Sequence, residues 1–294
     1  MSTLAGRAEH DQAGSSQMAG CDYVCIGHVT RDLRPGGYSW GGTVTYSART
    51  AQALGCRPAV VTRAESQLDL TPALGLIPVH RLDSAATTTF ENTYGPVGRR
   101  QKLLAWAGRI SAADLPQACR AAPVIHLAPV AQEVDSALIG LLTGSVIGLT
   151  PQGWHRRWDD SGTVSFAAWP EAAEVLPLAT AVIVSREDIT DQASWEIYRQ
   201  CAHLLVVTDG AAGCEVSTGG KTRWFRTTPV VETDPTGVGD VFAAAFFVRL
   251  WETGGDAWAA ARFATRIAAP TVARPGLAGI PMPDEVATAR AEVA

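Results

Sequence analysis

Residues 234–242, Asp-Pro-Thr-Gly-Val-Gly-Asp-Val-Phe, carry a group of residues whose types and spacing suit phosphate chemistry. Gly237 and Gly239 let the backbone turn tightly, and the apolar run 241–250, which has no glycine or proline, predicts a helix. The first N–H groups of a helix and its dipole favour an anion. Asp240 would lie close enough to take a proton from a hydroxyl attacking that anion. From the residues alone, an anion site with Asp240 as a base and a simple glycine-rich turn in which Asp240 caps the helix are equally supported.

Two other nucleotide-binding interpretations fail on their residues. The segment 218–222 resembles the end of a P-loop, but Glu215 stands where that motif requires glycine, and the alternating residues on either side predict a hairpin turn. The segment 237–242 begins like a dinucleotide-binding fingerprint, but Phe242 occupies the third glycine position. Only two of the 24 basic residues are lysines. Phosphate binding must therefore rest on arginine, on backbone N–H groups or on one of two lysines.

Alternating apolar strands and helix-length segments indicate how these residues are positioned. Residues 23–27 read as a buried strand, 45–54 as a helix ending at Gly55, and 58–62 as a second strand, an order that predicts a parallel sheet flanked by helices. Further short apolar runs extend the sheet at 124–128, 145–149, 181–184 and 204–208. The segments 87–94 and 99–105, joined by a turn at 95–98, predict a β-hairpin that would act as a lid.

Composition excludes several classes of protein. The 294 residues have a net charge of -5 and no basic run, which argues against a nucleic-acid partner. The six cysteines are scattered without zinc-site spacing, which is typical of reduced thiols in the cytoplasm. Residues 1–20 are polar and are expected to form a disordered leader, with neither a signal peptide nor a membrane span.

Five segments, in order over residues 21–285, resemble the PfkB or ribokinase family of sugar and nucleoside kinases. The strongest is the signature D-x-x-G-x-G-D-x-F at 234–242. The other four are the first strand with Asp32, the glycine pair Gly41-Gly42 with its helix, the strand and loop 207–213, and the segment Arg274-Pro-Gly276. The resemblance implies a ribokinase-like three-layer α/β/α sandwich with a small β lid. The kinase domain would span 21–294, with lid segments near 30–45 and 86–106.

The resemblance also implies transfer of the ATP γ-phosphate to a hydroxyl of a small-molecule substrate, with Mg²⁺ bridging the phosphates and a monovalent cation as a further cofactor. Asp240 would be the general base, and the N–H groups of Gly237, Val238 and Gly239 would form the anion hole. The implied substrate-binding residues are Asp32, Gly41, Gly42 and Tyr46. The implied nucleotide-binding residues are Ser185, Thr208, Gly210, Gly213, Arg274 and Gly276, and Asp188 would hold magnesium through water.

Departures from the family pattern bear on the substrate. Tyr46 replaces the asparagine of sugar kinases, which favours a cyclitol such as inositol, or an unusual sugar, over ribose or fructose, with a nucleoside also open. Ser185 and Asp188 stand where the family commonly has N-x-x-E, so one alternative is a catalytically impaired ligand-binding or regulatory protein on the same fold. Hydroxymethylpyrimidine-type kinases are a second alternative, which the predicted hairpin lid disfavours.

Two surface features complete the sequence predictions. The aromatic, basic segment 154–169, with Arg156 and Arg157, either covers a ligand or is a surface loop, and the surface loop is the favoured interpretation. An apolar lid face suits a homodimer through the lid; its residues are Phe90, Tyr94, Leu104 and Trp106. Arg186, beside the altered metal motif, is the candidate for a positive charge at the phosphates.

Overall fold

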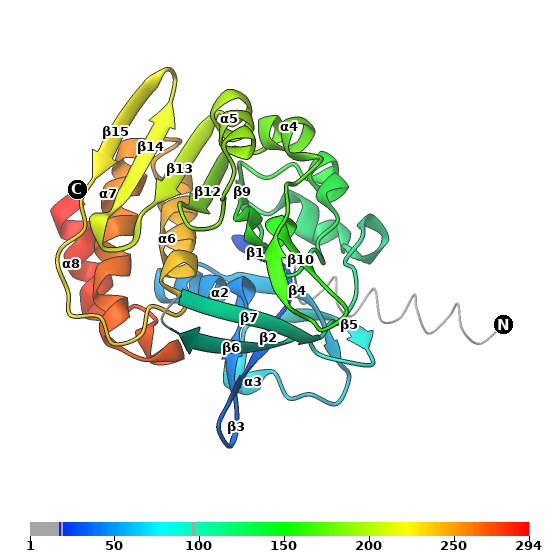
Figure 1. The fold of residues 1–294 in the computed structure, drawn as a ribbon. Helices are drawn as coiled ribbons and strands as arrows, with labels where there is room; N and C mark the ends of the chain where they lie inside the picture. The colour runs from blue at the N-terminus through cyan, green and yellow to red at the C-terminus, as the bar shows by residue number, and fades with distance from the viewer. Residues whose placement is uncertain (1–17, 19, 96–97, 294) are drawn as a thin grey trace.

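A nine-stranded sheet forms the centre of the computed structural model, which describes residues 18, 20–95 and 98–293. Most of the predicted leader 1–20 and part of the predicted turn 95–98 therefore lie outside the described residues. Seven neighbouring strands of this sheet run parallel: β5, β4, β1, β8, β9, β12 and β13. At the edge next to β13, β14 and β15 add an antiparallel hairpin (Figure 1). The strand order is β15 (Lys221–Phe225), β14 (Cys214–Thr218), β13 (Leu204–Thr208), β12 (Ala181–Ser185), β9 (Val146–Leu149), β8 (Val124–Leu127), β1 (Tyr23–Ile26), β4 (Pro58–Glu65) and β5 (Val79–Ser84).

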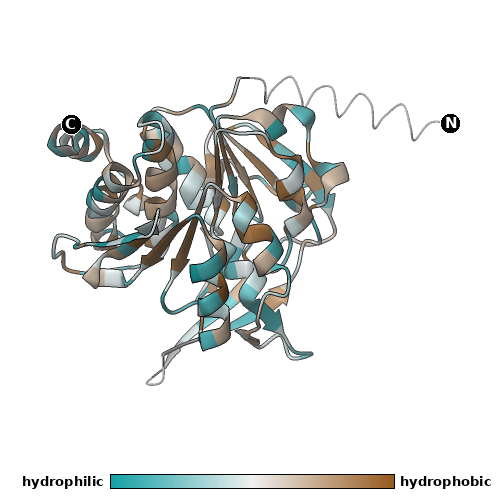
Figure 2. Ribbon diagram, turned by 90° about the horizontal axis from the view of Figure 1, so that it is seen from above, coloured by the Kyte–Doolittle hydropathy of each residue, from teal (hydrophilic) through white to brown (hydrophobic). Residues whose placement is uncertain are grey.

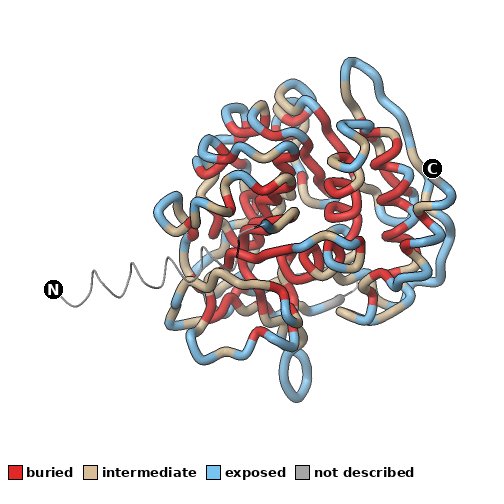
Figure 3. Tube along the Cα trace, turned by 180° about the vertical axis from the view of Figure 1, so that it is seen from behind, coloured by how far each residue is buried: buried red, intermediate tan, exposed pale blue. Residues whose placement is uncertain are grey.

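Two hydrophobic clusters, one on each face, hold helices against this sheet. Alternate residues of β1 point to opposite faces, so Tyr23 and Cys25 join one cluster and Val24 and Ile26 join the other. The central strands are buried on both sides, which explains their continuous apolar runs; they appear brown in Figure 2 and red in Figure 3. The ribokinase-like three-layer α/β/α prediction is confirmed.

The helices of the two outer layers differ in length. One layer is built mainly from α2 (Thr43–Ala53), α3 (Thr71–Leu74), α6 (Val238–Glu252), α7 (Ala257–Ala268) and α8 (Pro283–Val293). The other layer contains α4 (Ala172–Val175) and α5 (Gln192–Cys201) together with several 3₁₀ helices. Over both layers and the connecting segments, the 3₁₀ helices of the described residues are Ala112–Asp114, Gln117–Ala121, Ser136–Leu141, Pro151–His155, Leu176–Leu178, Gly210–Ala212, Ala269–Ala273 and Gly276–Gly279.

A separate four-stranded sheet lies beside the carboxyl end of β1. Its order is β3 (Gly37–Gly41), β2 (Thr30–Arg34), β6 (Thr89–Gly95) and β7 (Gly98–Ala105). We call this sheet the lid. A two-stranded sheet, β10 (Arg156–Trp158) and β11 (Val164–Phe166), continues it, because the Leu103 N–H donates to the Gly162 carbonyl at 2.8 Å. The favoured interpretation of this segment as a surface loop is therefore wrong, since its residues pair as strands and adjoin the lid.

The inner face of the lid is apolar and covered. Phe90 and Leu103 pack with Val130 and Ala131, and Phe90 is only 3% exposed. Phe90 therefore does not belong to an exposed apolar face, because it lies on the side of the lid that meets the α/β body. Leu104 and Trp106 do lie at the surface, at 49% and 39% exposure.

The rejected P-loop pattern is the turn of a hairpin. β14 and β15 pair antiparallel on either side of Gly219 and Gly220, which both have positive φ, 55° and 71°. Two successive residues of positive φ are typical of the tight turn that joins such strands. Among the described residues, no helix is long and apolar enough to cross a membrane.

The contact between the sheet and α6 predicts a stability effect at Gly148. A Cβ there would lie 2.5 Å from the Phe247 ring. We expect Gly148→Ala to lower the free energy of unfolding by about 1–3 kcal/mol, since the ring must move within a packed core. Gly140→Ala is the matched control because its Cβ would meet nothing within 4 Å. Urea unfolding of both variants measures the effect, and equal stabilities would contradict the packing.

Candidate active site

The signature segment forms the start of α6, and Gly237 makes its geometry feasible. Gly237 is the N-cap residue and has φ 81°, a left-handed conformation. A Cβ at this position would also lie 2.3 Å from the Tyr46 ring, so both the backbone conformation and the lack of space exclude a side chain. A Cβ on Gly239, in contrast, would have nothing within 4 Å. The first turn of α6 therefore has an open side on which a ligand can approach its N–H groups.

Asp234 holds this loop in place. Its carboxylate accepts hydrogen bonds from the N–H of Thr236 at 2.9 Å and of Gly276 at 3.0 Å. The N–H groups of Thr233 and Asp234 donate in turn to the Val272 carbonyl, at 2.8 and 3.0 Å. The first aspartate of the signature is thus a positioning residue that joins the loop before α6 to the segment after α7.

Helix α2 meets α6 beside Asp240. Ser47 donates its hydroxyl to the Asp240 backbone carbonyl at 3.1 Å, and Thr43 hydrogen bonds to the Asp240 carboxylate. Thr43 is buried at the first turn of α2, directly after the glycine pair. Sequence reasoning missed Thr43, although its position after Gly42 was the available signal.

Burial raises the pKa of Asp240 to about 7. The carboxylates of Asp188 and Asp32 raise the pKa further, whereas the Thr43 hydrogen bond and the positive charge of Arg156 lower it. A carboxyl group with a pKa near neutrality is suited to accept and release a proton at physiological pH. Asp32 and Asp188, although far from Asp240 in the sequence, therefore lie close enough in the fold for their charges to act on it.

The residues predicted to bind the substrate that accepts the phosphate lie together: Asp32, Gly41, Gly42 and Tyr46. A Cβ on Gly41 would be 2.5 Å from Asp32 Oδ2, and one on Gly42, which has φ 88°, would be 2.2 Å from the His28 carbonyl oxygen. Only glycine allows the backbone this close to the Asp32 carboxylate. Burial and the carboxylates of Asp240, Asp32 and Asp234 raise the pKa of Tyr46. Tyr46 is 3% exposed and forms the floor beneath Gly237.

Several of the residues predicted to bind the nucleotide that donates the phosphate lie at the carboxyl ends of neighbouring strands. Ser185 ends β12 and is paired in register with Thr208, which ends β13. Asp188 follows β12, and its carboxylate accepts a hydrogen bond from the Gln152 side chain at 2.9 Å. Arg186, the candidate cation of the sequence analysis, forms an ion pair with Asp209 at 3.1 Å.

The remaining donor-side residues have structural contacts of their own. Gly213 has φ 107°, and a Cβ there would lie 2.0 Å from the Phe225 carbonyl oxygen, while a Cβ on Gly210 would meet nothing within 4 Å. Arg274 forms a two-pronged ion pair with Glu285, at 2.7 and 2.9 Å. The Arg274 side chain thus ties the loop at Gly276 to the start of α8.

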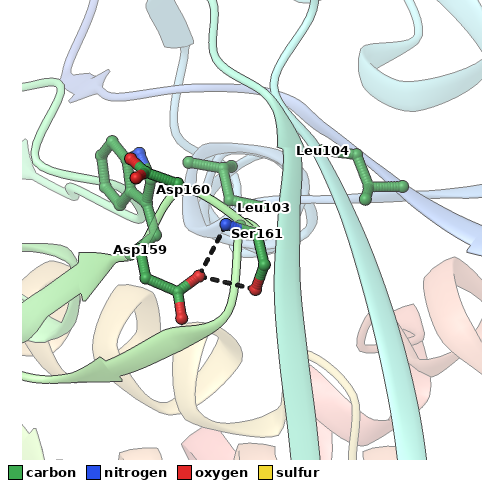
Figure 4. Close-up of a pocket in the computed structure, with 7 residues that line it drawn as sticks. Leu103, Leu104, Asp159, Asp160 and Ser161 are labelled. Carbon is green, nitrogen blue, oxygen red and sulfur yellow. Dashed lines mark hydrogen bonds between the residues drawn. The ribbon is translucent and has the colours of Figure 1, made fainter.

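A surface hollow of about 470 Å³ lies elsewhere, between the lid and the β10–β11 turn (Figure 4). Asp159, Asp160 and Ser161 line it, and the Asp159 carboxylate accepts hydrogen bonds from the Ser161 N–H and hydroxyl at 2.9 and 2.7 Å. These bonds shape the turn itself. None of the groups around Asp240 lines this hollow.

The described residues around Asp240 form no preformed cage for a metal ion. Within the described ranges, no group of three or more His, Cys, Asp or Glu side chains could hold a metal ion. Mg²⁺ usually takes one or two carboxylates together with phosphates and water, and does not need a cage of protein ligands. Asp188, the residue predicted to hold magnesium through water, could serve as one such carboxylate.

The raised pKa of Asp240 predicts a stability effect. An aspartate has a pKa near 3.8 when unfolded and Asp240 has about 7 when folded, so stability falls as pH rises from about 4 to about 7. We expect Asp240→Asn to melt at a higher temperature than the parent at pH 8, with the difference shrinking near pH 4. Asp160→Asn is the exposed control. A melting temperature of Asp240→Asn below that of the parent at pH 8 would contradict the burial of this charge.

Comparison with known proteins agrees with this geometry. A family model described as pfkB family carbohydrate kinase matches residues 163–285. The chain is similar to ribokinase of Bacillus subtilis, 43% identical over 83 residues, and to inositol 3-kinase of Zea mays, 33% identical over 97 residues. These matches cover 28% and 32% of the chain, and span only 28% and 25% of the lengths of the two relatives.

Solved structures share the fold over nearly the whole chain. One is a pyrophosphate-dependent kinase in the ribokinase family, complexed with a pyrophosphate analog and myo-inositol, with a TM-score of 0.76, 23% identity and coverage of 91% of this chain and 99% of that one. Ribokinase of Thermotoga maritima has a TM-score of 0.70, 18% identity and coverage of 92% and 99%. The family model contains the signature segment and confirms the resemblance of residues 163–285 to the PfkB family of carbohydrate kinases, and the solved structures show that the chain has the ribokinase fold.

Proposed function

We propose that the protein is a small-molecule kinase that transfers the γ-phosphate of ATP to a hydroxyl of a cyclitol or sugar, with Asp240 as the general base. The observation that carries this proposal is the position of Asp240. Its carboxylate lies in the first turn of α6, beside an open run of backbone N–H groups, and burial raises its pKa to about 7.

Each part of the reaction has a candidate group. Asp32 holds the acceptor against the backbone at Gly41 and Gly42, and Asp240 takes the proton from the attacking hydroxyl. A bond forms between that oxygen and the γ-phosphorus, the bond to the β-phosphate oxygen breaks, and ADP leaves. The N–H groups of Gly237–Gly239 stabilise the negative charge of the transferring group.

The donor would lie on the β12–β13 side of Asp240. Ser185 and Thr208 are the last residues of these strands, and Gly210 and Gly213 follow β13. Gly276, next to Arg274 in the chain, contacts Asp234 in the loop before α6. Mg²⁺, when bound, would neutralise charge on the phosphates. Asp188 is the carboxylate that would hold it through water. A monovalent cation remains part of the proposal.

Tyr46 bears on the acceptor. Its buried ring fills the space that a side chain at Gly237 would need, and the charges of Asp240, Asp32 and Asp234 act on its hydroxyl. Because the ring is only 3% exposed, it offers the acceptor no short amide to hydrogen bond with, which disfavours ribose and fructose and leaves a cyclitol as the preferred acceptor. Two relatives support this choice: the maize inositol 3-kinase and the pyrophosphate-dependent kinase that binds myo-inositol.

Two further expectations remain proposals. The exposed Leu104 and Trp106 support a homodimer through the lid, and the scattered free thiols fit a reducing cytoplasm. Size-exclusion chromatography with light scattering would determine the oligomeric state.

The proposed function is tested by a phosphorylation screen. Purified protein is incubated with myo-inositol and other cyclitols, ribose and other sugars, and nucleosides, each with ATP-Mg²⁺ and, separately, with pyrophosphate-Mg²⁺. We expect ATP-dependent phosphorylation of a cyclitol. Turnover with pyrophosphate alone would overturn the ATP donor but not the kinase. Binding without turnover across the panel would favour the alternative of an impaired ligand-binding or regulatory protein.

Asp240→Asn tests the base. Loss of the base is expected to lower kcat by about 10²–10⁴-fold, because the attacking hydroxyl keeps its proton. The dissociation constant for the nucleotide should change little, and Asp160→Asn should behave like the parent in both measurements. A kcat near the parent value would rule out the assignment.

The pKa of Asp240 sets the expected pH dependence. Asp240 must be ionised to take a proton, so kcat/KM of the free enzyme should rise with pH and level off above about 7. Initial rates between pH 5 and 9 measure this limb. Activity that stays flat from pH 5 to 7 would contradict a base with this pKa.

A further inference from the structure

Tyr46 is almost completely buried, yet its hydroxyl has no partner in the protein. The residue lies near the start of α2 and is only 3% exposed. Among the residues that the structure describes, no donor or acceptor is paired with this hydroxyl. Within the same described chain, the Thr50 hydroxyl one turn further along α2 is also unpaired but closed off from solvent, whereas the Tyr46 oxygen is not. The one polar atom of this side chain therefore faces an opening.

Two glycines show where the opening is. Gly237, the N-cap of α6, rests against the ring, since a Cβ there would lie 2.3 Å from Cδ1 and 2.4 Å from Cε1 of Tyr46. A Cβ on Gly276, apart from its chain neighbours, would meet one atom of the described chain within 4 Å, the Tyr46 Oη at 3.9 Å. The space between Gly276 and the hydroxyl is therefore open, and it adjoins the start of α6.

This open space lies at the junction of two loops that hydrogen bonds hold together. The Asp234 carboxylate accepts from the Gly276 N–H at 3.0 Å and from the Thr236 N–H at 2.9 Å. The first turn of α6 begins on one side of the junction, and a Cβ on Gly239 in that turn would meet nothing within 4 Å. An anion that approaches the first N–H groups of α6 from this side would therefore come within reach of the Tyr46 hydroxyl.

The chemistry of the hydroxyl suits an anionic oxygen. A phenol donates one hydrogen bond, and Tyr46 keeps its proton at neutral pH, because burial and nearby negative charges raise its pKa. Those charges belong to Asp240, Asp32 and Asp234. Ionised carboxylates accept hydrogen bonds and cannot donate them, so the phenol supplies a donor that they cannot. The neighbouring N–H groups at the start of α6 favour the same kind of partner.

Resting on the proposed kinase function, we propose that Tyr46 is a further catalytic residue, whose hydroxyl donates a hydrogen bond to a non-bridging oxygen of the γ-phosphoryl group in the bound donor and during its transfer. The acceptor oxygen bonds to phosphorus, its proton goes to Asp240, and the bond to the β-phosphate oxygen breaks. Tyr46 keeps its own proton and stabilises the negative charge on the phosphoryl oxygens. Its ring has a separate task, because it fills the space beside Gly237 and so supports the start of α6.

Tyr46→Phe separates the two tasks, because phenylalanine keeps the ring beside Gly237 and lacks the hydroxyl. With an acceptor found in the phosphorylation screen, we expect kcat/KM for the donor to fall about 10²-fold, as for the loss of one donor to a developing charge. KM for the acceptor and the melting temperature should change little. Tyr38→Phe is the matched control, since Tyr38 on β3 is 42% exposed, and it should behave like the parent.

Other roles of Tyr46 would give different results. If the residue only filled space, Tyr46→Phe would match the parent in kcat/KM for the donor, because the ring is kept. If the hydroxyl bound the acceptor instead, Tyr46→Phe would raise KM for the acceptor and leave KM for the donor unchanged. Either result overturns the proposal.

Binding of inorganic pyrophosphate separates this proposal from the proposed function. Calorimetric titration of the intact protein with pyrophosphate and Mg²⁺ needs neither an acceptor nor turnover. We expect Tyr46→Phe to bind pyrophosphate about tenfold more weakly than the parent, because a hydrogen bond to a charged group is lost, and Tyr38→Phe to bind it equally well. Equal binding by Tyr46→Phe and the parent, or no binding by the parent, overturns the role of Tyr46. If no acceptor is phosphorylated, the kinase proposal fails while this titration still decides whether Tyr46 binds phosphate.

Discussion

The meeting of two helix N-termini over a cluster of carboxylates is the constraint on which the rest of the site depends. Helices α2 and α6 both begin after a glycine of positive φ, Gly42 and Gly237. Glycine has no side chain with which to cap a helix, so the first N–H groups keep their capacity for another partner. Helices α5 and α7, in contrast, are capped by the carboxylates of Asp191 and Asp256. The two helices at the cleft are thus suited to receive negative charge from a ligand.

Carboxylates of the protein lie near the same helix N-termini, and their negative charges oppose the ionisation of Asp240. Burial is the largest cause that raises the energy of the ionised Asp240 carboxylate, and the charges of Asp188 and Asp32 raise it further. The hydrogen bond from the Thr43 hydroxyl and the positive charge of Arg156 lower that energy. A base with a pKa near 7 results from this opposition. A chain with only two lysines can meet the requirement because its positive character comes from helix termini and arginine.

The lid takes part in this electrostatic arrangement as well as covering the cleft. Its strands bring Asp32 from β2 and Phe90 from β6 to the same face. The β10–β11 pair continues the lid and carries Arg156 under it. Movement of the lid would therefore change the surroundings of the base.

Local sequence determined much of the fold and the central motif. Apolar runs between helix-length segments specify buried parallel strands, and the glycines and Asp240 specify an open helix start, because each of these depends on residues within a few positions. Tertiary structure alone decided the rest. Arg156 belongs to the site only because Phe90 and Val130 hold it there, and Thr43 reaches Asp240 only because α2 packs on α6. The pKa of Asp240 was likewise beyond sequence reasoning, since it depends on burial and on charges contributed by strands more than fifty residues away.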